Sequence, residues 1–143
     1  MKKLAIIFLI GIILIVGISY MYLNYKANYN TTRRENIKFE DYYNKELEVS
    51  DVVTLINKAY DYNLTNAVEK DQNGIFKENN INSIKIDLKM LDRDKIYNME
   101  AIYAGTMEKF AEMYTGIKFK CTKIDYHENG KIKYLLIEQI TTE

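Results

Sequence analysis

The strongest pattern in the chain is an unbroken apolar stretch over residues 4–23. Its twenty residues include no charge, and seventeen of them are aliphatic, aromatic or methionine. An α-helix of that length is about 30 Å long, which matches the hydrocarbon core of a bilayer. Because the apolar residues surround the helix on every side, the pattern predicts a transmembrane helix and not an amphipathic surface helix. Tyr20 and Tyr22 lie near its end, where tyrosine favours the membrane interface.

A cleaved signal peptide is the alternative for this stretch. Signal peptides have an apolar region of about 7–15 residues followed by a small-x-small cleavage site. The stretch here is longer and no A-x-A site follows it, although residues 17–19 (GIS) are a tolerable small-x-small substitute. We therefore expect a single-pass signal anchor over residues 1–23, with the lipid bilayer as the partner of residues 4–23. Lys2 and Lys3 on a very short tail favour a cell-membrane protein with an extracytoplasmic C-terminal domain, although basic residues flank both ends of the anchor.

Residues 24–36 are polar and show no period, which predicts a juxtamembrane linker ahead of a domain over residues 37–143. Two segments of that domain have a clear helical stripe. The first runs from Ser50, the expected N-cap, to about residue 63, and the second spans residues 106–115 with Gly116 as its C-cap. Shorter helices are expected over residues 37–45 and 94–103.

Strands are predicted in three places, two of them by alternating apolar and polar residues. Residues 84–90 alternate strictly, and residues 117–126 alternate with a change of parity that predicts a bulge near Thr122 and Lys123. Asn129-Gly130 is a strong turn signal and leads into residues 132–140. We therefore predict an α+β domain in which two or three helices pack on an antiparallel sheet that ends in a C-terminal hairpin.

Composition narrows the possible functions. Twenty basic and twenty acidic residues give a net charge of zero, which argues against nucleic acid as a partner. One Cys and one His exclude an internal disulfide and any site that needs several thiolates or imidazoles. Six glycines without a phosphate-loop spacing give no nucleotide motif. We expect no cofactor.

One run resembles a calcium-binding loop of the EF-hand type. Its candidate metal ligands are side chains at positions 1, 3 and 5 and a backbone carbonyl at position 7, supplied here by Glu69, Asp71, Asn73 and Ile75. Gly74 stands at position 6, where the loop turns sharply. Position 12 is Asn80, which cannot supply the bidentate carboxylate. A polar Asn-Gly turn between two elements is the simpler interpretation.

The residues that most often carry catalysis are not spaced for it. Cys121 and His127 are six residues apart on one predicted strand, about 20 Å, which is too far for a nucleophile and its base. Cys121 follows the parity of the apolar residues, so we expect a buried thiol. Asp125 and His127 could share a strand face, and a polar pair near a turn explains them more simply. We expect that the protein is not an enzyme.

Four segments of the chain resemble those of a group of small N-terminally anchored membrane proteins from low-G+C Gram-positive bacteria. They are residues 49–59 (VSDVVTLINKA), 82–86 (NSIKI), 99–102 (MEAI) and 119–127 (FKCTKIDYH). That group has no assigned function, so the resemblance implies placement in the cell envelope and nothing about activity. We expect an interaction module that contacts an envelope protein, a wall polymer or a second copy of itself. A cation- or ligand-sensing envelope domain and a pilin-like assembly subunit are the alternatives.

Overall fold

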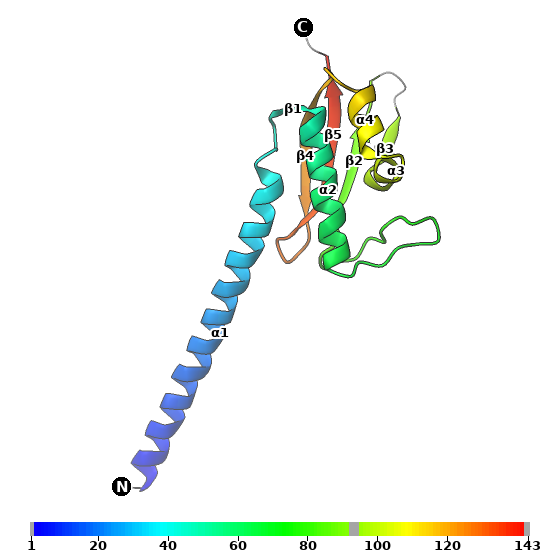
Figure 1. The fold of residues 1–143 in the computed structure, drawn as a ribbon. Helices are drawn as coiled ribbons and strands as arrows, with labels where there is room; N and C mark the ends of the chain where they lie inside the picture. The colour runs from blue at the N-terminus through cyan, green and yellow to red at the C-terminus, as the bar shows by residue number, and fades with distance from the viewer. Residues whose placement is uncertain (1, 92–94, 142–143) are drawn as a thin grey trace. The chain divides into compact units, whose positions relative to one another are not determined.

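The computed structural model describes residues 2–91 and 95–141. The chain forms two compact units, Met1–Glu35 and Asn36–Glu143. A helix, α1 (Lys2–Glu40), makes up the described part of the first unit and contributes its last residues to the second. The second unit contains β1 (Glu46–Glu48), α2 (Val49–Thr65), β2 (Lys85–Lys89), β3 (Ile96–Asn98), α3 (Met99–Ala104), α4 (Met107–Met113), β4 (Lys118–Tyr126) and β5 (Ile132–Ile140). The structure is therefore α+β, with a long apolar N-terminal helix (Figure 1).

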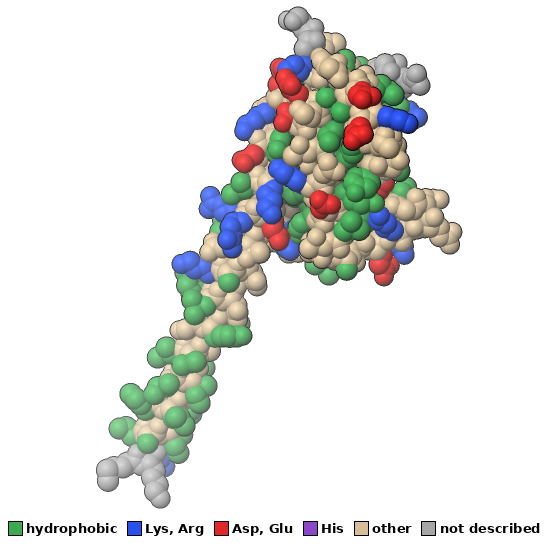
Figure 2. Space-filling model, viewed as in Figure 1, with side chains coloured by type: hydrophobic (Ala, Val, Ile, Leu, Met, Phe, Trp, Pro, Cys, Tyr) green, Lys and Arg blue, Asp and Glu red, His purple; other side chains and the backbone are tan. Residues whose placement is uncertain are grey.

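Helix α1 is apolar and uncovered over its first half. Large apolar side chains between Leu4 and Leu23 are exposed to the surroundings, and Figure 2 shows them along this part of the helix. This is one helix long and apolar enough to cross a membrane, by length and composition. Residues 24–36, which the polar pattern assigns to a linker, continue the same helix. They contain no glycine or proline to interrupt it, and an exposed helix does not need an apolar stripe.

The sheet has five strands in the order β1-β4-β5-β2-β3. Strand β4 pairs antiparallel with both β1 and β5, and β2 pairs antiparallel with β3. Strands β2 and β5 run parallel, so the prediction of an antiparallel sheet was wrong and the sheet is mixed. Local alternation shows which residues face the core, but it does not report strand direction. The register of β4 against β5 shifts between Cys121 and Lys123, where the change of parity predicts a bulge.

Helix α2 covers one face of the sheet, and α3 and α4 contact α2 and each other (Figure 1). The core between the layers includes Leu55 and Ile56 of α2 and alternate residues of the central strands, among them Ile86, Leu135 and Ile137. Near the end of α1, Phe39 joins this core. The Asn36 side chain there donates to the Gly130 carbonyl at 2.8 Å and accepts from the Ile132 amide at 3.1 Å. This part of α1 is thus fixed to the turn between β4 and β5.

Helix boundaries differ from the predictions where a capping residue or a short strand intervenes. The N-cap of α2 is Glu48 and not Ser50, because Asp51 accepts from the Glu48 amide in a capping box. The helix expected over residues 37–45 is only the end of α1, followed by turns and β1. The C-cap of α4 is Tyr114, two residues before Gly116.

The helix expected over residues 94–103 is the short strand β3 followed by α3. Its expected first residue, Asp94, lies outside the described residues. Three-residue strands such as β1 and β3 are too short to show a period of two.

Candidate functional site

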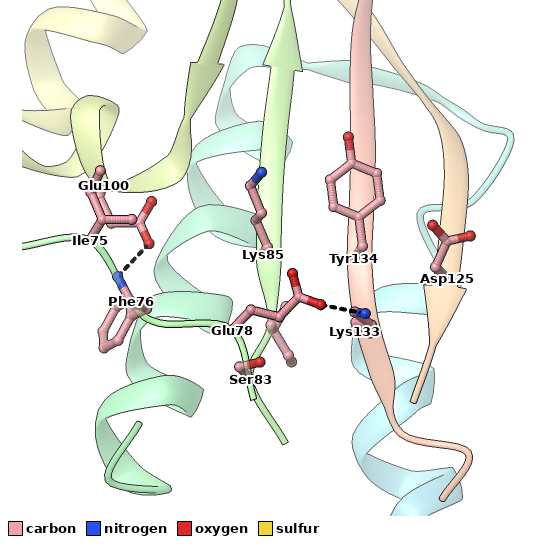
Figure 3. A pocket seen from close by; sticks show the side chains of 10 residues that line it. Ile75, Phe76, Glu78, Ser83, Lys85, Glu100, Asp125, Lys133 and Tyr134 are labelled. Carbon is pink, nitrogen blue, oxygen red and sulfur yellow. Dashed lines mark hydrogen bonds and ion pairs between the residues drawn. The ribbon is translucent and has the colours of Figure 1, made fainter. Parts of the chain in front are cut away.

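A cleft opens on the sheet face that α2 does not cover. Cross-strand partners share a face, and the register aligns Lys85 of β2 with Tyr134 of β5 and Tyr134 with Asp125 of β4. Their neighbours in the strands, such as Ile86 and Leu135, are buried on the helical side. Figure 3 shows Lys85, Tyr134 and Asp125 side by side along one wall of the cleft.

The opposite wall comes from the segment that leads from α2 to β2 and from α3. Ile75, Phe76 and Glu78 lie in that segment, and Glu100 lies in α3 (Figure 3). The backbone amide of Phe76 donates to Oε1 of Glu100 at 3.2 Å, which ties the segment to the helix. The cavity has a volume of about 460 Å³, within the range of small-molecule sites.

Ion pairs connect most charged groups of the cleft. Lys133 pairs with Glu78, Lys85 pairs with Asp87 at 3.2 Å, and Asp125 pairs with Lys123 at 2.7 Å. The hydrogen bond from Lys133 lowers the pKa of Glu78. Burial, followed by the nearby Asp87 carboxylate, raises the pKa of Tyr134 to about 12. Glu78 is therefore ionised and the Tyr134 hydroxyl keeps its proton at neutral pH.

Glu100 differs from the other carboxylates of the cleft. Its side chain belongs to a residue only 8% exposed. Oε1 accepts the Phe76 amide proton, while Oε2 is buried and has no hydrogen-bond partner among the described residues. No sequence signal pointed to Glu100, because residues 99–102 have the composition of an ordinary helical turn.

The residues of the candidate calcium loop form a turn. Oδ1 of Asp71 accepts from the amides of Asn73 and Ile75 at 2.8 and 3.0 Å, and Gly74 has a φ of +79°. Glu69 pairs with Lys77 at 3.2 Å. The Asp71 carboxylate therefore organises the backbone of a tight turn. Among residues 2–91 and 95–141, no group of three or more His, Cys, Asp or Glu is placed to hold a metal ion.

The structure keeps Cys121, Asp125 and His127 in separate environments. Cys121 is fully buried, and burial raises the pKa of its thiol to about 11. His127 is buried, and its Nε2 donates to the Ser83 carbonyl at 2.8 Å. Asp125 pairs with Lys123 and faces the cleft. His127 thus helps to hold the start of β2 against the turn between β4 and β5.

Comparisons with known proteins give no relative. No protein-family model, no curated protein and no solved structure matches the chain. The functional argument therefore depends on the geometry of this structure.

Proposed function

We propose that the protein is a single-pass membrane protein whose anchor is residues 4–23 and whose domain, residues 37–143, is an extracytoplasmic interaction module. The observation that carries this proposal is the uncovered apolar helix. Exposing a large aliphatic or aromatic side chain to water costs about 1.5–3 kcal/mol. Along residues 4–23 such side chains are exposed at nearly every position, and a bilayer removes that cost.

The end of the apolar stretch supports a helix that stops at a membrane surface. Tyr20, Tyr22, Tyr25 and Tyr29 are exposed there. Tyrosine rings favour the level of the lipid headgroups, and lysine or arginine beyond them extends toward water. Lys26 and Arg33 follow in the same helix. The apolar stretch thus passes into an interfacial segment while the helix continues.

The extracytoplasmic side is supported by two basic residues before the apolar stretch. Lys2 and Lys3 lie directly before the apolar stretch, and basic residues next to a membrane helix favour the cytoplasmic side. The resemblance to anchored proteins of Gram-positive bacteria implies placement in the cell envelope. We accordingly place the function in contacts made outside the membrane, with an envelope protein, a wall polymer or a second copy as partner, and we expect no catalysis.

The test labels single cysteines on intact cells. Cys121 is replaced by Ala, and Glu128→Cys in the domain is compared with Lys3→Cys in the tail. We expect a membrane-impermeant maleimide to label the Glu128→Cys protein on intact cells and the Lys3→Cys protein only after permeabilisation. Reversed labelling would contradict the orientation. A mature chain that begins near residue 20 and leaves the membrane in alkaline carbonate would contradict the anchor.

A further inference from the structure

The buried carboxylate of Glu100 is an acceptor without a matching donor. Oε2 has no partner among the described residues, and only Oε1 is satisfied, by the Phe76 amide. Leaving a buried acceptor unpaired costs about 1–3 kcal/mol, and more when the group is charged. Folded proteins rarely keep such an atom unless something binds it. Figure 3 shows the Glu100 carboxylate at the side of the cleft, directed toward the space that Lys85 borders.

The charges around the cleft indicate which ligand would fit. The residues that line it include three carboxylates, those of Glu78, Glu100 and Asp125, and two ammonium groups, those of Lys85 and Lys133. Both lysines are already paired with a carboxylate. The charge without a partner is therefore negative, so the cleft favours a cation over an anion.

The remaining walls are apolar and too poor in oxygen ligands for a metal ion. Ile75, Phe76 and Ile84 contribute aliphatic and aromatic surface, and the ring of Tyr134 closes another side. Calcium and magnesium need about six oxygen ligands, whereas no three acidic, histidine or cysteine side chains of the described residues are placed to hold a metal ion. An organic cation needs only one strong acceptor and a surface for its carbon skeleton.

We propose that the cleft binds a small organic ammonium ion, whose N–H group donates to Oε2 of Glu100 and whose apolar part packs against Phe76 and Ile84. Oε2 lies below the surface, so binding requires a side chain at the border of the cleft to move, and we assign that movement to Lys85. The Lys85 side chain is 53% exposed, which leaves room for that movement. This site does not depend on the membrane anchor.

The test is a titration of the full-length protein in maltoside micelles with benzylammonium chloride, followed by the amide resonance of Phe76. That amide is bonded to Glu100 and reports on its carboxylate. Titration with benzylammonium to about 10 mM detects dissociation constants up to the millimolar range. We expect a saturable shift of this resonance. The affinity for benzylammonium should fall at least tenfold in Glu100→Gln, which keeps the acceptor for the Phe76 amide but removes the charge. Glu78→Gln is the matched control, because the Glu78 carboxylate is already paired with Lys133. Its affinity for benzylammonium should lie within about threefold of that of the unmodified protein, a change of less than 1 kcal/mol in binding free energy.

Two results would overturn the proposal. The first is a Phe76 resonance that does not move with benzylammonium, or moves equally in Glu100→Gln. The second is an equal response to benzyl alcohol, which has the same ring and no charge, because it would mean that the cleft selects apolar shape alone. A folded spectrum for Glu100→Gln makes the first result decisive, and the comparison with benzyl alcohol on the unmodified protein decides the matter if that variant does not fold.

Discussion

At the scale of single residues, the fold depends on polar side chains that bind backbone groups inside the domain. Asn63 is fully buried near the end of α2, and it bonds both backbone groups of Ile84. Its Nδ2 donates to the Ile84 carbonyl at 2.7 Å, and its Oδ1 accepts from the Ile84 amide at 2.8 Å. One side chain thus replaces a pair of sheet hydrogen bonds just before β2 begins.

Replacing Asn63 by Ala should lower the free energy of unfolding by about 3 kcal/mol, because two buried backbone groups lose their partners at about 1–3 kcal/mol each. Chemical denaturation of the full chain in micelles measures this. Asn57→Ala in the same helix is the control and should change stability by less than about 0.5 kcal/mol. Equal effects of the two substitutions would contradict the role given to Asn63.

The thiol of Cys121 should be inert in the folded protein. Burial raises its pKa from an ordinary 9.0 to about 11, and the side chain is fully covered. The reactive form is the thiolate, so at pH 8 an aromatic disulfide reagent should react at least a hundredfold more slowly with the folded chain than with the chain in denaturant. A rapid reaction under native conditions would show that β4 opens locally.

At the scale of elements, the sequence predicted a helix or strand correctly where the segment itself carries a clear pattern or turn signal. The buried residues of α2 follow the helical stripe, and β5 has the predicted bounds, which follow the Asn129-Gly130 turn signal. Strands β1 and β3 are three residues each and depend on their neighbours for structure. The parallel pairing of β2 with β5 and the position of Glu100 beside Phe76 both arise from contacts between distant segments, which no local pattern reports.

Charges in the middle of the apolar stretch should release the protein from membranes. Each arginine at the centre of a membrane helix costs about 2.5–3.5 kcal/mol. The double variant Ile10→Arg/Ile13→Arg should therefore lose most of its membrane-bound fraction after carbonate extraction. Asn28→Arg/Thr32→Arg adds the same charge beyond the stretch and should remain bound. Retention of the first variant to the same degree as the second would contradict the span.

At the scale of the whole molecule, several protons are held more tightly in the folded state. Burial raises the pKa of Cys121 to about 11 and those of Tyr126 and Tyr134 to about 12. For Tyr126 the hydrogen bond to Glu40 adds to the effect of burial. Groups with raised pKa values stabilise the fold below their unfolded pKa and lose that contribution as the pH rises through the folded value.

The domain should therefore lose stability between about pH 9 and pH 12. Denaturation midpoints of the full chain at a series of alkaline pH values would show the decline. Cys121→Ala with Tyr126→Phe removes two of the three groups and should make the decline shallower. A midpoint that stays constant to pH 12 would contradict the burial of these groups.

The position of β5 has a consequence for how the domain is made. Strand β5 lies between β4 and β2, and it is the last described strand in the chain. Strands β2 and β4 do not pair with each other, and β5 joins them. The Asn36 side chain is also bonded to the backbone at Gly130 and Ile132, next to the start of β5. In a nascent polypeptide leaving the ribosome, the pair β1-β4 and the pair β2-β3 would therefore stay unjoined until β5 had emerged. In the proposed orientation, β5 crosses the membrane before the sheet can close.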